Sequence, residues 1–212
     1  MKILIAVPTF ENIYPDTFKS IFDLDFCGND VDFEFVRGYD CATARNKIVK
    51  LALEKSADYV LMVDNDVVLP KDALRNFLDD SKDVCLGYYA HRDKVNVYNG
   101  NTCICRLYDA SGTAYYNYPL ESEYTAEEME KMRNAGQYKV RIHGGGSGCA
   151  FVKTSVYNRI KYPWYNWIHY RNGGILGEDL YFCEACKKNG IPVYTDTRVS
   201  CGHMFRYIQN VE

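Results

Sequence analysis

Residues 59–66 read Tyr-Val-Leu-Met-Val-Asp-Asn-Asp, a short apolar run that stops at two carboxylates. An apolar run of this length without alternation is typical of a strand buried on both faces of a parallel sheet. Lys2–Val7 has the same character and ends at Pro8. Because ligands bind outside the carboxyl ends of the strands in such a sheet, we expect Asp64 and Asp66 to face a ligand site.

The first ninety residues alternate between strand and helix patterns. Pro15 suits the first turn of a helix in which Phe18, Ile21 and Phe22 recur at the spacing of one helical face. The other predicted elements are a strand at Phe33–Val36, a helix at Ala42–Leu53 capped by Asp40 or Thr43, a short helix from Pro70 to Leu78, and a strand at Val84–Tyr89. This alternation predicts an α/β fold with an open, mostly parallel sheet.

The pattern is less regular after residue 90. Thr125 and Glu128 form a capping box for a helix that Gly136 closes, and Glu178–Asn189 has acids at its start and lysines at its end, as a second helix would. Predicted strands are Thr102–Tyr108, Tyr138–Ile142, Gly148–Lys153 and Val193–Thr195. Since no internal repeat or linker separates these elements, we expect residues 1–212 to form a single domain.

The composition is that of an ordinary globular protein, with 47% hydrophobic residues, 25% charged residues and a net charge of −3. Nine cysteines scattered through predicted strands and helices favour a reduced compartment, and the Cys183–Cys186 pair is interpreted as core packing. The apolar run at the N-terminus is too short for a signal peptide, and no segment has the 18 or so apolar residues of a spanning helix. We therefore predict a cytoplasmic protein without a membrane span.

The Asp-Asn-Asp triplet has two interpretations. Acids one residue apart on an extended segment point to opposite sides, so one can bind a divalent cation while the other accepts hydrogen bonds from a ribose hydroxyl or a metal-bound water. Such a cation would lie against a diphosphate. Alternatively, the triplet is only a polar turn that closes a strand.

Five short motifs occur in a fixed order along the chain: Val7-Pro8-Thr9-Phe10, Ala44-Arg45-Asn46, the 59–66 stretch, Gly177-Glu178-Asp179 and Gly202-His203. In this order they resemble the family 2 type of GT-A glycosyltransferase. The resemblance implies a mixed, mostly parallel central sheet flanked by helices. It also implies a nucleotide-binding half at about residues 1–90 and an acceptor-binding half at about residues 91–212.

The resemblance implies a site for a nucleotide diphosphate sugar, and it favours uridine as the nucleoside of that donor. Arg45 matches a basic residue that reaches toward the nucleotide, where its planar fork can grip phosphate oxygens or stack on a base; the alternative is an ordinary surface arginine. The residues that the resemblance places at the nucleotide sugar are Pro8, Thr9, Phe10, Glu11, Asp40, Arg45, Asp64 and Asn65.

A metal site and a catalytic base also follow from the resemblance. The implied metal residues are Asp64, Asp66 and His203; Asp66 binds Mn²⁺ or Mg²⁺ directly, Asp64 touches ribose or a bound water, and the imidazole favours manganese. Asp179, with Glu178 second, is the implied base that takes the proton from the acceptor hydroxyl, with inversion at the sugar. Without the resemblance, acids in a first helical turn are also explained by the helix dipole.

The acceptor is left open by the sequence. Residues 137–172 contain six Lys or Arg and no acid, interleaved with aromatic residues, and we expect Trp164, Trp167 and Arg171 to contact the acceptor. The leading hypothesis is a saccharide or other hydroxyl acceptor. A nucleic-acid acceptor such as a hydroxymethylated base, a non-catalytic nucleotide-sugar binding module, and a merely solvated basic face are the alternatives.

Two further features bear on how complete the site is. The glycine-rich run at residues 143–148 either lets backbone amides approach the donor closely or is a flexible loop without a ligand. The chain ends shortly after His203. We therefore expect either a compact acceptor site or one completed by a partner.

Overall fold

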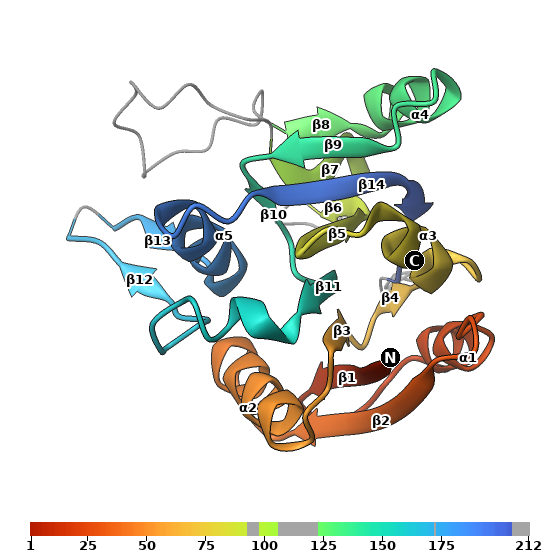
Figure 1. The fold of residues 1–212 in the computed structure, drawn as a ribbon. Coiled ribbons are helices and arrows are strands. Elements are labelled where there is room, and N and C mark those ends of the chain that lie inside the picture. Colours follow the sequence, from red (N-terminus) through yellow and green to blue (C-terminus); the bar gives the residue numbers. More distant parts are fainter. Residues whose placement is uncertain (93–97, 106–122, 172, 205–212) are drawn as a thin grey trace, which may run out of the picture.

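A seven-stranded sheet forms the centre of the protein (Figure 1) in the computed structural model, which describes residues 1–92, 98–105, 123–171 and 173–204. The strand order is β2-β1-β3-β11-β5-β14-β9. In that order the strands are Asp30–Arg37, Lys2–Thr9, Tyr59–Val63, Cys149–Lys153, Val84–Tyr88, Val193–Ser200 and Lys139–Ile142. Most of these segments are apolar runs with fully buried residues, as expected for a sheet covered on both faces.

Five of the seven strands (β1, β2, β3, β5 and β14) run in the same direction, while β11 and β9 are antiparallel to their neighbours. This confirms the predicted mixed, mostly parallel α/β sheet. Because β11 lies antiparallel between β3 and β5, its first residue, Cys149, pairs with Val63 at the end of β3. The glycine-rich run that precedes β11 therefore lies at the same sheet edge as the carboxyl ends of the parallel strands.

Helices cover both faces of the sheet (Figure 1). The helices α2 (Cys41–Glu54) and α5 (Glu178–Lys188) pack into one hydrophobic cluster, to which α4 (Ala126–Asn134) adds Met129. The helices α1 (Pro15–Phe22) and α3 (Ala73–Asp80) pack into a second cluster on the other face. Among the described helices, none is long and apolar enough to cross a lipid bilayer.

The predicted helix caps are confirmed, and α1 begins at the predicted Pro15 with Ile21 buried. Asp40 caps α2 through the Thr43 N–H, and the Thr125 capping box begins α4. In α1, Phe18 and Phe22 are 47% and 77% exposed. The buried Ser20 hydroxyl of the same helix accepts the N–H of Leu69 at 3.0 Å.

Smaller sheets bring distant segments to the carboxyl edge. In these sheets β7 (Tyr98–Cys105) pairs with β6 (Ala90–Arg92), β8 (Glu123–Thr125) and β10 (Gly144–Gly145), β12 (Ile168–His169) pairs with β13 (Ile175–Leu176), and β15 (Gly202–His203) pairs with β4 (Val67–Val68). Residues 106–108 of the predicted strand Thr102–Tyr108 lie outside the described residues. The β4–β15 pair returns the end of the described chain to the segment that follows β3.

Candidate functional site

Asp64 directly follows β3 and is held against the start of β11. Its backbone N–H donates to the carbonyl of Gly148 at 2.9 Å. Its two carboxylate oxygens accept hydrogen bonds from the same Arg45 nitrogen, Nη2, at 2.9 and 3.2 Å. The acid is thus fixed by backbone on one side and by a buried arginine on the other.

Arg45 lies inside the protein and joins two of the predicted acids. Its side chain is 3% exposed, and besides Asp64 it donates to Glu178 and to the carbonyl of Ser147, at 3.4 and 3.3 Å. Burial acts to lower the pKa of the guanidinium, but the charges of Asp64 and Glu178 outweigh burial and raise it. The guanidinium therefore stays charged, and its donors are directed at protein groups rather than at an open nucleotide site.

Asp66 and His203, far apart in sequence, meet across the β4–β15 pair. The Asp66 carbonyl accepts the N–H of Met204 at 2.8 Å, and His203 Nε2 lies 3.6 Å from Asp66 Oδ2. Nδ1 of His203 lies 2.9 Å from the carbonyl of Ala90. Because a carbonyl only accepts, Nδ1 carries a proton, and Nε2 is the ring nitrogen that faces the carboxylate.

This arrangement fits a cation between Asp66 and His203. Two acceptor atoms do not face each other favourably unless a proton or a metal ion lies between them. Ligand atoms about 2.1 Å from one ion are about 3.0–3.6 Å apart when the angle at the ion is 90–120°. Within the described residues no group of three His, Cys, Asp or Glu side chains forms a metal centre.

The adjacent acids Glu178 and Asp179 have different environments in the first turn of α5. Glu178 is 6% exposed and bound by Arg45. Asp179 accepts the N–H of Leu180 at 2.7 Å, and burial together with the charge of Glu178 raises its pKa to about 6. Asp179 therefore changes protonation near neutral pH, as a general base does.

Tyr89, which follows β5, fills the centre of this edge. Its hydroxyl accepts the N–H of Gly148 at 3.1 Å, and its ring packs edge-on against His203 with the ring centres 4.8 Å apart. A Cβ on Gly146 would overlap the Tyr89 hydroxyl, and one on Gly148 would lie 2.7 Å from it. The buried glycine run is thus packed against other groups of the site and is not a flexible loop.

The first predicted nucleotide loop lies beside Asn65. The Asn65 side-chain amide donates to the Asn12 carbonyl at 2.7 Å and to the Thr9 hydroxyl at 3.4 Å. Phe10, 70% exposed, and Glu11 project from this loop, which begins at Pro8 in β1. Asp40 is exposed at the start of α2, where it serves as the helix cap.

The predicted acceptor residues separate in the structure. Trp164 is a core residue, 8% exposed, and its indole N–H donates to the Tyr157 carbonyl at 2.8 Å. Trp167 is 42% exposed. A Cβ added to Gly177 would lie 3.7 Å from the Trp167 ring and 2.8 Å from Asp179 Oδ1, so both side chains are next to Gly177. Trp167 therefore lies near Asp179, the predicted catalytic base, whereas Trp164 does not reach the surface as an acceptor contact would require. Arg171 is exposed beyond β12.

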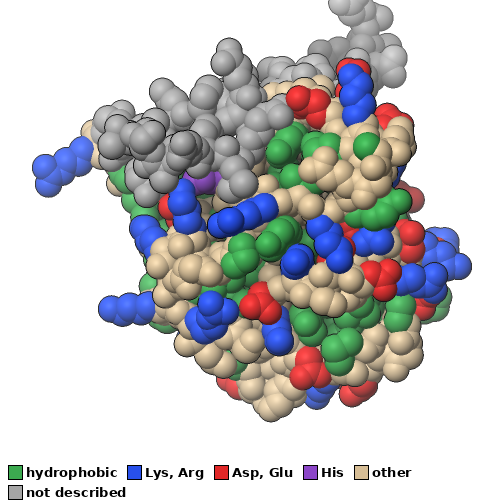
Figure 2. Space-filling view, turned by 45° about the horizontal axis from the view of Figure 1, so that its top comes forward, with side chains coloured by type: hydrophobic (Ala, Val, Ile, Leu, Met, Phe, Trp, Pro, Cys, Tyr) green, Lys and Arg blue, Asp and Glu red, His purple; other side chains and the backbone are tan. Residues whose placement is uncertain are grey.

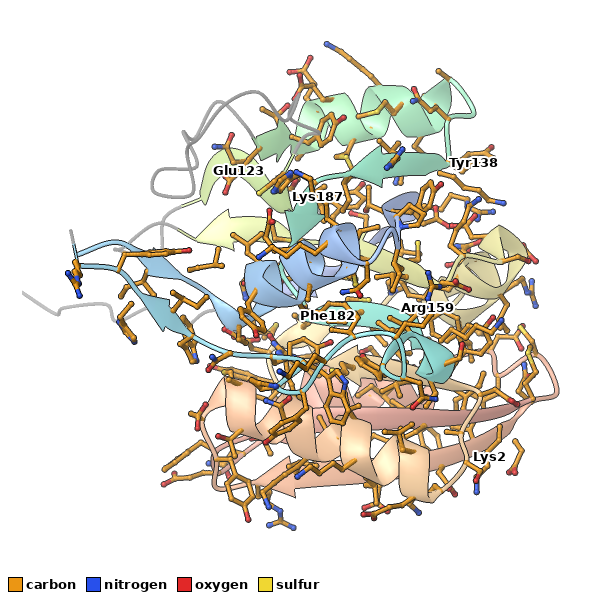
Figure 3. The ribbon with its side chains drawn as sticks, turned by 60° about the vertical axis from the view of Figure 1, so that its left-hand side comes forward. Lys2, Glu123, Tyr138, Arg159, Phe182 and Lys187 are labelled. Atoms are coloured by element: carbon orange, nitrogen blue, oxygen red, sulfur yellow. The ribbon has the colours of Figure 1, made fainter. Side chains whose placement is uncertain are left out.

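The basic stretch at residues 137–172 does not form one surface. Lys139 pairs with Asp80, while Lys153 and Arg159 pair with Asp83. Tyr157 and Tyr165 are buried against Phe182 of α5, and Phe182 is labelled in Figure 3. Figure 2 shows Lys and Arg side chains spread over the visible face with Asp and Glu between them. Tyr157 and Tyr165 therefore belong to the core and cannot stack on bases.

Solved structures share this architecture. "A197 from STIV" superimposes with a TM-score of 0.61 at 17% identity, covering 97% of this chain and 87% of that one. "GalNAc-T7 with UDP, GalNAc and Mn2+" gives a TM-score of 0.63 at 10% identity, covering 97% of this chain and 44% of that one. The fold is that of the GT-A glycosyltransferases. No family model and no curated protein matches the sequence.

Within this GT-A fold, the predicted acids and His203 meet at one edge, and two residues take places that the sequence did not reveal. Arg45 was predicted to contact the nucleotide, yet it is buried between Asp64 and Glu178. Tyr89 was not singled out at all. The signal for it was the run of glycines at residues 144–146 together with Gly148, because consecutive glycines in a buried segment indicate that other groups approach closely.

Proposed function

We propose that the protein is a metal-dependent glycosyltransferase that moves a sugar from a nucleotide diphosphate donor, of which a uridine diphosphate sugar is our choice, to a hydroxyl acceptor with inversion. The observation that carries the proposal is the approach of His203 Nε2 to Asp66 Oδ2, 3.6 Å apart, beside the Asp64–Arg45–Glu178 cluster. The structure of GalNAc-T7, which shares the fold, contains UDP, GalNAc and Mn²⁺.

Asp66 and His203 are the residues that would hold the cation. The Ala90 carbonyl orients His203 by accepting the Nδ1 proton, which leaves Nε2 as a ligand. A nitrogen ligand beside a carboxylate is consistent with Mn²⁺. The bound ion supplies positive charge next to the diphosphate as it leaves.

The remaining steps belong to the side chains of the chain itself. Asp64, fixed by Arg45 and by the Gly148 carbonyl, faces the ribose hydroxyls or a bound water. Asp179 takes the proton of the acceptor hydroxyl as its oxygen bonds to the anomeric carbon and the bond from that carbon to the diphosphate breaks. Because one displacement replaces the leaving group from the opposite side, the configuration inverts.

Trp167 is our choice for the acceptor contact. Its exposed ring lies beside Gly177 and Asp179, where the acceptor hydroxyl must reach the base. An aromatic face there suits the apolar face of a sugar ring. Since Tyr157, Trp164 and Tyr165 are buried, the proposal favours a saccharide or other small hydroxyl acceptor over a nucleic acid.

The test is the release of nucleoside diphosphate from a panel of nucleotide sugars, with and without Mn²⁺. We expect Mn²⁺-dependent release from one donor. In Asp66→Asn the rate of release should fall about 100-fold or more, because loss of a direct metal ligand should cost at least as much activity as loss of a residue that only orients a ligand. Asp16→Asn, an exposed aspartate on α1, is the matched control and should keep full activity.

Two results would contradict this proposal. Release at an equal rate without any divalent cation would remove the metal from the mechanism. Metal-dependent binding of a nucleotide without turnover of any donor and acceptor pair would favour a non-catalytic nucleotide-sugar binding module instead.

A further inference from the structure

Tyr89 links two parts of the candidate site that come from different segments of the chain. Its ring contacts His203, which ends β15, and its hydroxyl accepts the N–H of Gly148, which precedes β11. Gly148 in turn accepts the N–H of Asp64 through its carbonyl at 2.9 Å. A continuous set of contacts therefore runs from His203 through Tyr89 and Gly148 to Asp64.

The local sequence leaves room for this hydroxyl at two positions. At Gly146 any larger residue would occupy the space of the Tyr89 oxygen, and a Cβ on Gly148 would lie 2.7 Å from that oxygen and 3.0 Å from Asp64 Oδ2. A buried phenol whose oxygen accepts a backbone N–H keeps a single orientation.

We propose that Tyr89 is a positioning residue for metal and donor binding: it fixes His203 and the Gly148–Asp64 contact relative to each other, so that Asp64, Asp66 and His203 face one Mn²⁺–diphosphate group. This inference rests on the proposed function, because it assigns a role at the same site. The Tyr89 ring packs against the His203 imidazole. The Tyr89 hydroxyl fixes the backbone of Gly148, whose carbonyl accepts the N–H of Asp64.

Loss of the hydroxyl alone should separate this role from simple packing. In Tyr89→Phe the ring contact with His203 is retained, but the Gly148 N–H loses its acceptor and the segment before β11 is released. Metal sites lose roughly 10- to 100-fold in affinity when the partners behind their ligands are removed. The variant should therefore bind Mn²⁺ more weakly even where it is folded as well as the wild type.

The test is titration of Mn²⁺ in the presence of saturating UDP, followed by the electron paramagnetic resonance signal of the free ion. We expect the Kd for Mn²⁺ to rise about tenfold or more in Tyr89→Phe. Tyr157→Phe is the matched control, because it removes a buried phenol whose oxygen lies 3.2 Å from that of Tyr165 in the core. Its Kd should stay within twofold of the wild type.

The outcomes are distinguishable. A Kd for Tyr89→Phe within twofold of the wild type, or an equal rise in Tyr157→Phe, would overturn the role of Tyr89. Failure of the wild type to bind Mn²⁺ with UDP would instead contradict the proposed function. If Tyr89→Phe does not fold, Gly146→Ala, which displaces the same hydroxyl, should give the same weakening, and unchanged affinity there would overturn the inference.

Discussion

At the scale of the residue, the site separates two neighbouring acids into different roles. Glu178 forms an ion pair with the Arg45 guanidinium, in which Nε lies 3.4 Å from Oε1. Asp179 has its carboxyl buried next to that charge, and burial and the charge of Glu178 raise its pKa to about 6. Adjacent carboxyl groups in unlike environments are a common basis for assigning one of them to proton transfer.

The first prediction concerns the pH dependence of transfer. A base must be deprotonated to accept a proton, so activity should fall as the pH drops below about 6 and level off above it. Glu178→Gln keeps an oxygen for Arg45 but removes the negative charge that helps to raise the pKa of Asp179. The acidic limb of kcat/KM against pH should then move to lower pH, and the exposed Glu54→Gln should leave the profile unchanged. A limb that stays in place would assign it to another group.

At the scale of the element, the glycine run before β11 is shaped by its neighbours. Gly144 packs against Cys183 of α5, where a Cβ would lie 2.8 Å from the cysteine Cβ, and Gly146 packs against the Tyr89 hydroxyl. Both residues are buried. Two glycines in one segment thus make room for two different partners, and their effects on stability should be separable.

A double-mutant cycle tests this separation. Overpacking costs about 1–3 kcal/mol, so Gly146→Ala and Gly144→Ala should each lower the free energy of unfolding by that order. In a Tyr89→Phe background the oxygen that Gly146→Ala meets is gone, and its cost should shrink by about 1 kcal/mol or more. Gly144→Ala should cost the same in both backgrounds, since Cys183 is unchanged. Urea denaturation measures all of these, and additive effects at Gly146 would show that the hydroxyl does not occupy that space.

The elements also show how far sequence reasoning reaches. Periodicity and caps located β3 and the helices α2 and α5 within about one residue, because these signals are local. The hydrogen bond between Ser20 of α1 and Leu69 joins separate segments, so local signals do not reveal it. Tyr89 was missed for the same reason: its partners Gly148 and His203 are far from it in sequence. Asp66 was singled out by its place after a buried strand, whereas His203 and the metal role of both residues came from the resemblance.

At the scale of the whole molecule, the site lies where separate parts of the sheet meet. Asp64 and Asp66 follow β3, Tyr89 follows β5, and His203 follows β14. The two hydrophobic clusters lie on opposite faces of the same sheet, and Leu61 and Met62 of β3 point into different clusters. The division into nucleotide and acceptor halves near residue 90 stays a prediction, but a donor bound at this edge would touch both sides of that boundary.

A ligand that contacts several parts of one sheet should therefore stabilise the entire fold. UDP with Mn²⁺ at about 100 times its Kd adds about 2.7 kcal/mol to the free energy of unfolding. For a domain of this size that corresponds to a rise in Tm of roughly 5–11 °C. The increase should require UDP and Mn²⁺ together, because Asp66 and His203 alone offer only two ligands. In Asp66→Asn, Mn²⁺ should add nothing to the effect of UDP, whereas Asp16→Asn should behave as the wild type. Differential scanning calorimetry provides the measurement; a Tm that rises equally with UDP alone would show that the nucleotide binds without a metal, and the cation would then have no place between Asp66 and the diphosphate.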